Sequence, residues 1–166
     1  MRQNEEANIM EVLLSPWAWL VRQLEFVGSF LPQLGLRLLL AYEFWDSGIR
    51  KLHGENWFSE IQDKFPFPFN HIPPDISWTM ATWFELVGPV MLVLGLGTRF
   101  FSLSLIILTV VAWVSVHAGE GYNVCDGGWQ LPLMYLIMFV PLLLNGGGKL
   151  SLDHVLYQWF SKQKKQ

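Results

Sequence analysis

The chain has 166 residues, of which 52% are hydrophobic and 15% are charged, and its formal net charge is -3. An ordinary soluble domain carries roughly a quarter charged residues, so this composition favours a membrane protein of a single domain. The small net charge indicates neither a nucleic-acid-binding protein nor a partner for a polyanion. The single cysteine, Cys125, excludes a disulfide within one chain. The first ten residues, MRQNEEANIM, are acidic and polar, unlike a signal peptide.

Four segments are long and apolar enough to cross a hydrocarbon core about 30 Å thick, which needs roughly 20 residues of helix. They are residues 33–52, 76–96, 100–118 and 129–144. The first is the weakest signal because it contains five charged residues. We predict an all-α fold, a membrane four-helix bundle.

Two amphipathic stretches flank the four segments. In residues 9–31, apolar side chains recur at helical spacing, but Arg22 and Glu25 argue against a full crossing. In residues 151–160, the apolar side chains again share one face. Both stretches are typical of helices that lie in the membrane interface; the alternative is that they pack against the bundle as core helices. The predicted organisation is therefore an interfacial segment (1–32), a four-helix domain (33–150), and an amphipathic helix with a basic tail (151–166).

The distribution of basic residues predicts the orientation in the membrane. The side that holds both termini and the connection at residues 97–99 contains Arg2, Arg22, Arg99, Lys149, Lys162, Lys164 and Lys165. The other side contains Arg50, Lys51 and Lys64 mixed with acidic residues. We expect both termini on the cytoplasmic side of a bacterial inner (plasma) membrane, with the loop at residues 53–75 facing outwards.

Charged side chains inside a spanning helix cost several kcal/mol unless they are paired or hydrated, so they are the main functional candidates. Counted from their helix ends, Glu43 and Glu85 both lie about 14 Å deep, and the sequence predicts a polar pocket in the outer half of the bundle. Its candidate members are Glu43, Asp46, Arg50, Lys51, Glu85 and His117. The pocket would bind a polar head group or relay protons; the alternative is a salt-bridge network that only fixes helix packing.

Other polar side chains receive simpler interpretations. Arg37, nearer the cytoplasmic end, is expected to snorkel to the interface, and Arg99 to be an inside-facing topology residue. The four histidines show no paired spacing that would predict a haem, and we expect no metal site.

The order of several short motifs resembles the DoxX family of small four-helix membrane proteins. These motifs are Leu36-Arg37-Leu38, Gly48 with Lys51-Leu52-His53-Gly54, Glu85-Leu86-Val87-Gly88, Leu94-Gly95-Leu96-Gly97-Thr98-Arg99-Phe100, and Gly146 with Gly148-Lys149-Leu150-Ser151-Leu152-Asp153. The family pattern has paired glycines after the glutamate, whereas here Pro89 follows Gly88. The sequence EFWDSGIRKLHGENWF is further similar to DoxX-type members that accompany bufferin-type metal-binding peptides.

The resemblance implies several functions. DoxX relatives include a subunit of a quinone-linked thiosulfate dehydrogenase, and others are membrane partners in oxidoreductase or stress-response systems. A quinone site would suit Trp45, Trp83 and Trp113 as apolar walls, with Glu85 or His117 as the proton partner. Because the sequence has no motif for an electron-carrying cofactor, such a subunit would need a protein partner, or would act as a homo-oligomer. The alternatives are a non-catalytic accessory protein for an enzyme or metal-binding peptide and, less favoured, a small transporter.

Overall fold

The computed structural model describes residues 16–163, and these form helices and loops without a β-strand. The chain divides into two compact units, residues 1–32 and 33–166. In the first unit, residues 16–28 are helical, and the backbone N–H of Ser29 donates to the carbonyl of Glu25 where that helix ends. The apolar side chains Trp17, Trp19, Leu24 and Phe26 are exposed. Residues 9–15 of the predicted interfacial segment lie outside the described residues, and the interfacial role stays a prediction.

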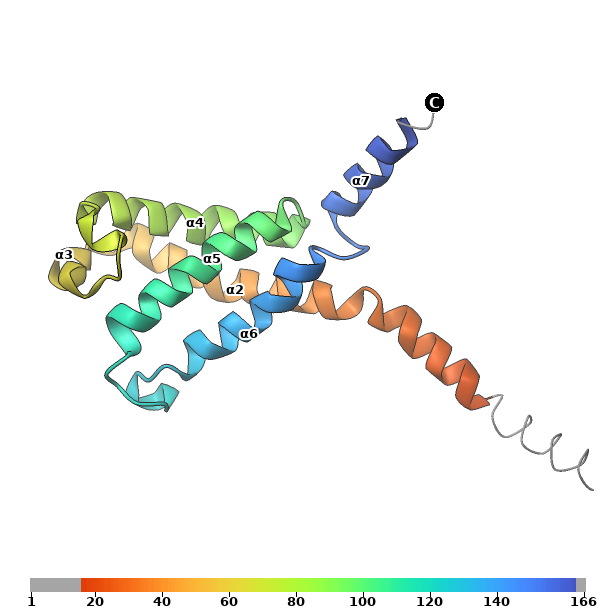
Figure 1. The fold of residues 1–166 in the computed structure, drawn as a ribbon, viewed down its shortest axis with the longest axis horizontal. Coiled ribbons are helices and arrows are strands. Elements are labelled where there is room, and N and C mark those ends of the chain that lie inside the picture. Colours follow the sequence, from red (N-terminus) through yellow and green to blue (C-terminus); the bar gives the residue numbers. More distant parts are fainter. Residues whose placement is uncertain (1–15, 164–166) are drawn as a thin grey trace, which may run out of the picture. The chain divides into compact units, whose positions relative to one another are not determined.

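The four predicted long helices belong to the second unit, apart from the first two residues of α2 (Figure 1). They are α2 (Leu31–His53), α4 (Pro74–Leu94), α5 (Thr98–Ala112), which continues as the π-helical turn η3 (Trp113–His117), and α6 (Gln130–Asn145). Each agrees with its predicted segment to within two residues. Among the described residues, three helical stretches are long and apolar enough to cross a membrane, Pro16–His53, Pro74–Leu94 and Thr98–His117; Gln130–Asn145 is apolar but shorter. The prediction of an all-α membrane bundle is confirmed.

Short elements connect the long helices. Between α2 and α4 lie α3 (Phe58–Ile61), η1 (Gln62–Lys64) and η2 (Phe69–His71). The 3-10 turn η4 (Val124–Asp126) precedes α6, and α7 (Leu152–Gln163) follows it. We call the end of the bundle where α2 stops and α4 starts the α3 end. The opposite end, where residues 95–97 join α4 to α5, is called the turn end.

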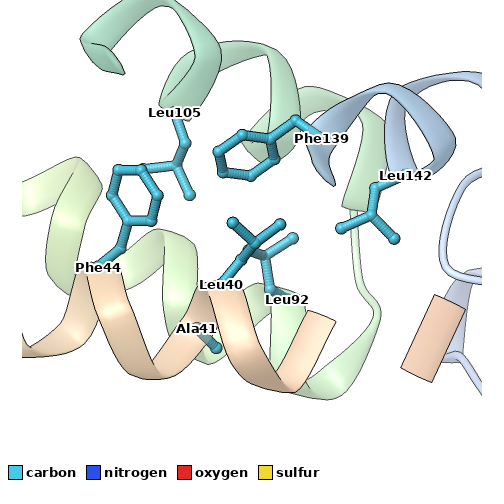
Figure 2. Packing of buried hydrophobic residues seen from close by; sticks show 7 residues of the cluster. All are labelled: Leu40, Ala41, Phe44, Leu92, Leu105, Phe139 and Leu142. Atoms are coloured by element: carbon cyan, nitrogen blue, oxygen red, sulfur yellow. The ribbon is translucent and has the colours of Figure 1, made fainter. Parts of the chain in front are cut away.

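The core lies where α2, α4, α5 and α6 face one another. Its buried members are Leu40, Ala41, Phe44, Leu92, Leu105, Phe139 and Leu142 (Figure 2). The rings of Phe44 and Phe139 pack in a tilted arrangement with centroids 5.5 Å apart. Most other apolar side chains of the four helices are exposed, as expected for helices whose outer faces contact lipid rather than water.

The turn end is held by side-chain bonds to the backbone. α4 stops at Gly95, whose φ of 67° is in the left-handed region that glycine adopts without strain. The carboxylate of Asp153 accepts hydrogen bonds from the backbone N–H groups of Gly97 and Thr98 at 2.8 and 2.9 Å. It thereby caps the first turn of α5 from a distant part of the sequence. In return, the N–H of Asp153 donates to the carbonyl of Gly95 at 2.9 Å, so the start of α7 is fixed to the turn.

Arg37 corrects one of our predictions, because it does not snorkel. It is only 1% exposed, and its guanidinium donates to four backbone carbonyls at 2.6 to 2.8 Å. These carbonyls belong to Leu92, Val93, Gly147 and Leu150. The last carbonyls of a helix have no partner within the helix and carry partial negative charge. The planar guanidinium group of Arg37 therefore provides hydrogen-bond donors both to the carbonyl groups at the end of α4 and to those in the loop after α6.

Candidate functional site

A cavity of about 310 Å³ lies at the α3 end. Its lining comes from the last turn of α2, from the segment between α2 and α4, and from the facing sides of α4 and α5 with η3. We call residues 54–73, which contain α3, η1 and η2, the α3 segment. The side chains are almost all apolar, and six of them are aromatic or isoleucine residues of the α3 segment. The polar exceptions are Lys51, Glu85 and three serines, Ser77, Ser104 and Ser115. An apolar pocket with a few polar groups is the usual form of a small-molecule site.

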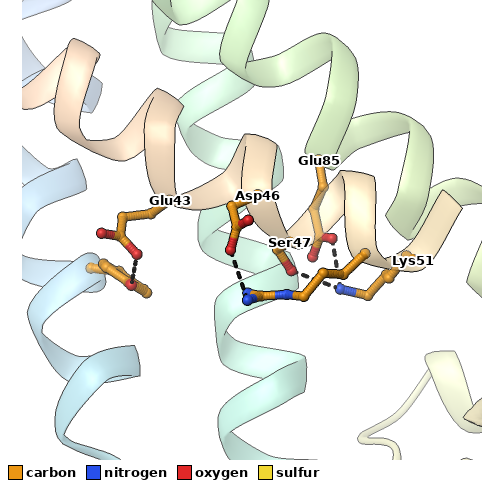
Figure 3. A network of polar contacts seen from close by, with 7 residues as sticks. Glu43, Asp46, Ser47, Lys51 and Glu85 are labelled. Carbon is orange, nitrogen blue, oxygen red and sulfur yellow. Dashed lines mark hydrogen bonds and ion pairs between the residues drawn. The ribbon is translucent and has the colours of Figure 1, made fainter. Parts of the chain in front are cut away.

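The charged part of the cavity wall is one ion pair. The Nζ of Lys51 lies 2.6 Å from Oε2 of Glu85 and donates a second hydrogen bond to Oγ of Ser47 at 3.0 Å (Figure 3). The two charged side chains are 15% and 9% exposed. A pair this well buried is expensive to separate, since either partner alone would be an uncompensated charge in an apolar wall. The pair therefore gives the cavity a donor and a carboxylate at one fixed place.

Gly48 sets the position of this pair by letting two helices approach. A Cβ atom at residue 48 would lie 2.8 Å from the carbonyl oxygen of Glu85 and 2.9 Å from a methyl group of Leu86. Only the absence of a side chain allows the α2 and α4 backbones to come this close. Lys51, one turn further along α2, then reaches across to Glu85.

This contact shows that the predicted equal depth of Glu43 and Glu85 is wrong. Glu85 lies beside Gly48, which is five residues, or about 7.5 Å of helix, nearer the α3 end than Glu43. The prediction measured the depth of each glutamate from the end of its own helix, and so assumed that the end of α2 and the start of α4 lie at the same depth. The close approach at Gly48 instead staggers them.

The cavity has an aromatic cap made by the α3 segment. The ring of Phe58 packs edge to face against Trp57, Phe65 and Trp78, with centroid distances of 5.0, 5.2 and 5.0 Å. Such edge-to-face pairs are favourable beyond their buried area. Phe65 is only 6% exposed although it belongs to a loop. Our sequence prediction missed this cap, although the aromatic residues and prolines of residues 57–74 were its visible signal.

Two serines of the cavity lining, Ser115 and Ser77, lie in unusual surroundings. The helix of α5 widens into the π-helical turn η3, whose Ser115 donates to the carbonyl of Val111 at 2.7 Å. Single π-helical turns occur often at functional sites. In addition, the buried hydroxyl oxygen of Ser77 has no hydrogen-bond partner within the described part of the chain. Buried polar atoms normally find a partner, and this hydroxyl belongs to a residue of the cavity lining.

The other candidate pocket residues lie elsewhere. Glu43 accepts a hydrogen bond from the hydroxyl of Tyr135 on α6 at 2.8 Å. Asp46 and Arg50 pair with each other at 2.7 Å along α2, with side chains 54% and 72% exposed (Figure 3). His117 bonds through Nδ1 to the backbone carbonyl of Gly127. The structure thus brings Lys51 and Glu85 together in the cavity wall, and none of the other four candidates lines it.

The three predicted tryptophan walls lie apart from this cavity as well. Trp45 is 44% exposed and lines a shallow groove between α2 and α4 with Pro89 and Val93. Trp83 is 62% exposed on α4. Trp113 stacks on Trp129 with centroids 5.4 Å apart and planes 12° from parallel. Whether any of them contacts a ligand stays a prediction.

Among residues 16–163, no three His, Cys, Asp or Glu side chains cluster in a way that would hold a metal ion.

A family model described as DoxX matches residues 32–118, which contain Lys51, Glu85 and the whole lining of the cavity. The chain belongs to the DoxX family. Two curated Haemophilus influenzae proteins, both named "Uncharacterized protein", are similar to it. One is 52% identical over 134 residues, covering 81% of this chain and 89% of the relative. The other is 31% identical over 130 residues, covering 74% and 89%. No solved structure matches.

The DoxX motifs fall at the close contacts of the fold. Gly48 and the glutamate motif meet where α2 touches α4. A Cβ on Gly88 would lie 3.2 Å from the side chain of Leu105, so α4 also packs tightly on α5 despite Pro89. The glycine motif of residues 95–97 forms the turn that Asp153 caps. The DoxX pattern therefore marks the contacts that hold the bundle and position the Lys51–Glu85 pair.

Proposed function

We propose that this DoxX protein is the membrane subunit of a redox system and that it binds a quinone in the cavity at the α3 end. The observation that carries the proposal is the combination of an aromatic-capped apolar cavity of about 310 Å³ with one ion pair in its wall. A quinone is a flat apolar ring with two carbonyl oxygens. The apolar lining suits the ring, and the Lys51–Glu85 pair suits one of the oxygens.

The chemistry assigns different roles to the two charged residues. The ammonium group of Lys51 is a hydrogen-bond donor for a quinone carbonyl, and it stabilises negative charge that develops there during reduction. Full reduction of a quinone takes up two electrons and two protons. In the reverse direction, when a quinol is oxidised, the Glu85 carboxylate is a base for the proton of the nearer hydroxyl, and the second proton passes to water. The electrons must come from or go to a partner protein, because the sequence contains no motif for an electron-carrying cofactor.

Ligand binding by the purified protein tests this proposal. The protein in mild detergent is extracted for bound quinone and titrated with a quinone while its tryptophan fluorescence is recorded. We expect Glu85→Gln and Lys51→Met to weaken binding. Asp46→Asn and Arg50→Gln are the matched controls, since they remove the exposed ion pair on a neighbouring face of α2. If no quinone binds, or if all four variants bind alike, the proposal fails. A copurifying partner without any bound quinone would favour the accessory role instead.

We also propose that both termini are cytoplasmic and that the α3 end faces outwards in a bacterial inner membrane. The basic residues at the termini and at Arg99 support this orientation. Cys125 offers a direct test, because it is the single cysteine and is exposed near the start of α6. A membrane-impermeant maleimide should label Cys125 from outside intact spheroplasts. It should not label Gln163→Cys in a Cys125→Ser background, and the reverse pattern would overturn the orientation.

A further inference from the structure

We propose that the ligand of this cavity is a tailed, bilayer-dissolved quinone, which enters between α4 and α5 and leaves its tail in that opening. This inference rests on the proposed function and specifies the class of quinone and its route. The alternative routes are from water, through the α3 segment, or from the interior of the bundle.

Helices α4 and α5 form a V whose apex is the turn at residues 95–97. Figure 1 shows α4 and α5 meeting at the turn end and separating towards the α3 end. Between the apex and the cavity they are tightly packed, with Gly88 of α4 against Leu105 of α5. The cavity lies in the wider part of the V, where α4 contributes residues from Ser77 to Glu85 and α5 contributes residues from Ser104 onwards.

The cavity's lining reaches the lipid-facing surface of these helices. Met80 of α4, Ile107 of α5 and Val116 of η3 line the cavity, yet they are 45%, 41% and 41% exposed. Residues that contact both a cavity and the surroundings mark its mouth. Because the exposed sides of α4 and α5 are apolar, this mouth opens to hydrocarbon rather than to water.

The α3 segment covers the aqueous side of the cavity. Its lining residue Trp57 is 40% exposed, but the Trp57 ring is held in place by edge-to-face packing against Phe58 and Trp78. Phe65 of the α3 segment is 6% exposed, and the ring of Phe58 packs against Phe65 and against Trp78 of α4. Three backbone-directed bonds hold this segment: Asn56 Oδ1 accepts from the N–H of Phe58, and Gln62 Nε2 donates to the carbonyls of Asn70 and Ile72. A solute from water would have to displace these contacts, whereas a molecule from the bilayer meets only exposed apolar side chains.

The volume of the cavity limits how much of a tailed quinone it can hold. A volume of about 310 Å³ is at the small end of ligand pockets, which span roughly 300–1,000 Å³. It suits a ring placed beside Lys51 but not a ring with a long chain. The tail of a bound quinone therefore passes between Met80 and Ile107 into the lipid.

The test compares a decyl-tailed benzoquinone with the same ring lacking the tail, using the full chain in lipid nanodiscs. Ile107→Trp narrows the mouth. Leu103→Trp is the matched control, because Leu103 lies one turn earlier on α5 and is 47% exposed, but does not line the cavity. We expect Ile107→Trp to raise the dissociation constant of the tailed quinone about tenfold more than that of the tail-less ring, because only the tail has to pass through the narrowed mouth. Leu103→Trp should change neither.

The outcomes separate this inference from the proposed function. If the tailed quinone binds Ile107→Trp as tightly as it binds the unmodified protein, the route is wrong while the quinone site stands. The same holds if only the tail-less ring binds the unmodified protein. If neither quinone binds, the proposed function fails and this inference fails with it.

Discussion

Replacing Gly48 with alanine tests the contact that positions the charged pair of the cavity. The new Cβ would lie 2.8 Å from the carbonyl oxygen of Glu85 and 2.9 Å from its carbonyl carbon. Optimal separations between carbon atoms are about 3.5–4.0 Å. The obstructing atoms belong to the α4 backbone, which cannot turn aside like the end of a flexible side chain, so the two helices must move apart. Overpacking of this kind typically costs about 1–3 kcal/mol.

Alanine also has an opposite effect, which must be separated from the clash. It is a better helix former than glycine by about 0.8–1.0 kcal/mol. Gly35→Ala measures that gain on the same helix, because a Cβ at residue 35 would meet nothing within 4 Å. The difference between the two variants isolates the clash, and we expect Gly48→Ala to be less stable than Gly35→Ala by about 1–3 kcal/mol.

The assay is reversible unfolding in mixed micelles with increasing sodium dodecyl sulfate, followed by circular dichroism. Quinone binding by both variants provides a second readout, which should weaken only in Gly48→Ala because Lys51 no longer reaches Glu85 correctly. If Gly48→Ala is as stable as Gly35→Ala and binds ligand as well, the α2 and α4 backbones are not in contact at this residue. The account of the cavity wall would then be refuted.

Three further substitutions test the remaining polar contacts by the same unfolding assay. Arg37→Lys keeps the charge but cannot serve four carbonyls with a planar fork, so we expect a loss of about 2–4 kcal/mol; unchanged stability would contradict the burial of Arg37. Asp153→Ala removes the cap of α5 and should cost about 1–2 kcal/mol, with faster hydrogen exchange at the amide of Thr98. Equal exchange would mean that the cap is not formed. Tyr135→Phe removes one bond to Glu43 and should cost only about 0.6 kcal/mol, whereas a loss several times larger would show that Glu43 depends on Tyr135 for more than this bond.

The candidate site was predictable only in part. Charge within an apolar segment singled out Lys51 and Glu85, and the structure pairs them. The same rule also selected Glu43, which faces Tyr135 on α6 instead. Hydropathy shows that a charge lies within a span, but it does not show which neighbouring helix the charge faces. Which helix a charge faces depends on the rotation of its own helix about its axis, and its depth relative to a charge on the neighbouring helix depends on the stagger seen at the Gly48 contact.

Arg37 and the aromatic cap illustrate a second limit. From the sequence, Arg37 was a charged side chain near a helix end, for which snorkelling is the usual solution. Its actual partners are carbonyls from α4 and from the loop after α6, more than fifty residues away. The rings of residues 57–78 likewise become a cap only because the α3 segment folds back over α4.

The sequence by itself determined the number, type and limits of the long helices, because the length and apolarity needed to cross a bilayer are local properties of a segment. The family motifs determined membership in DoxX for the same reason, since they are short and contiguous. Only the tertiary structure decided which charges meet, where the cavity lies and what closes it. Those features depend on how closely two backbones approach, and in this protein one missing side chain at Gly48 sets that distance.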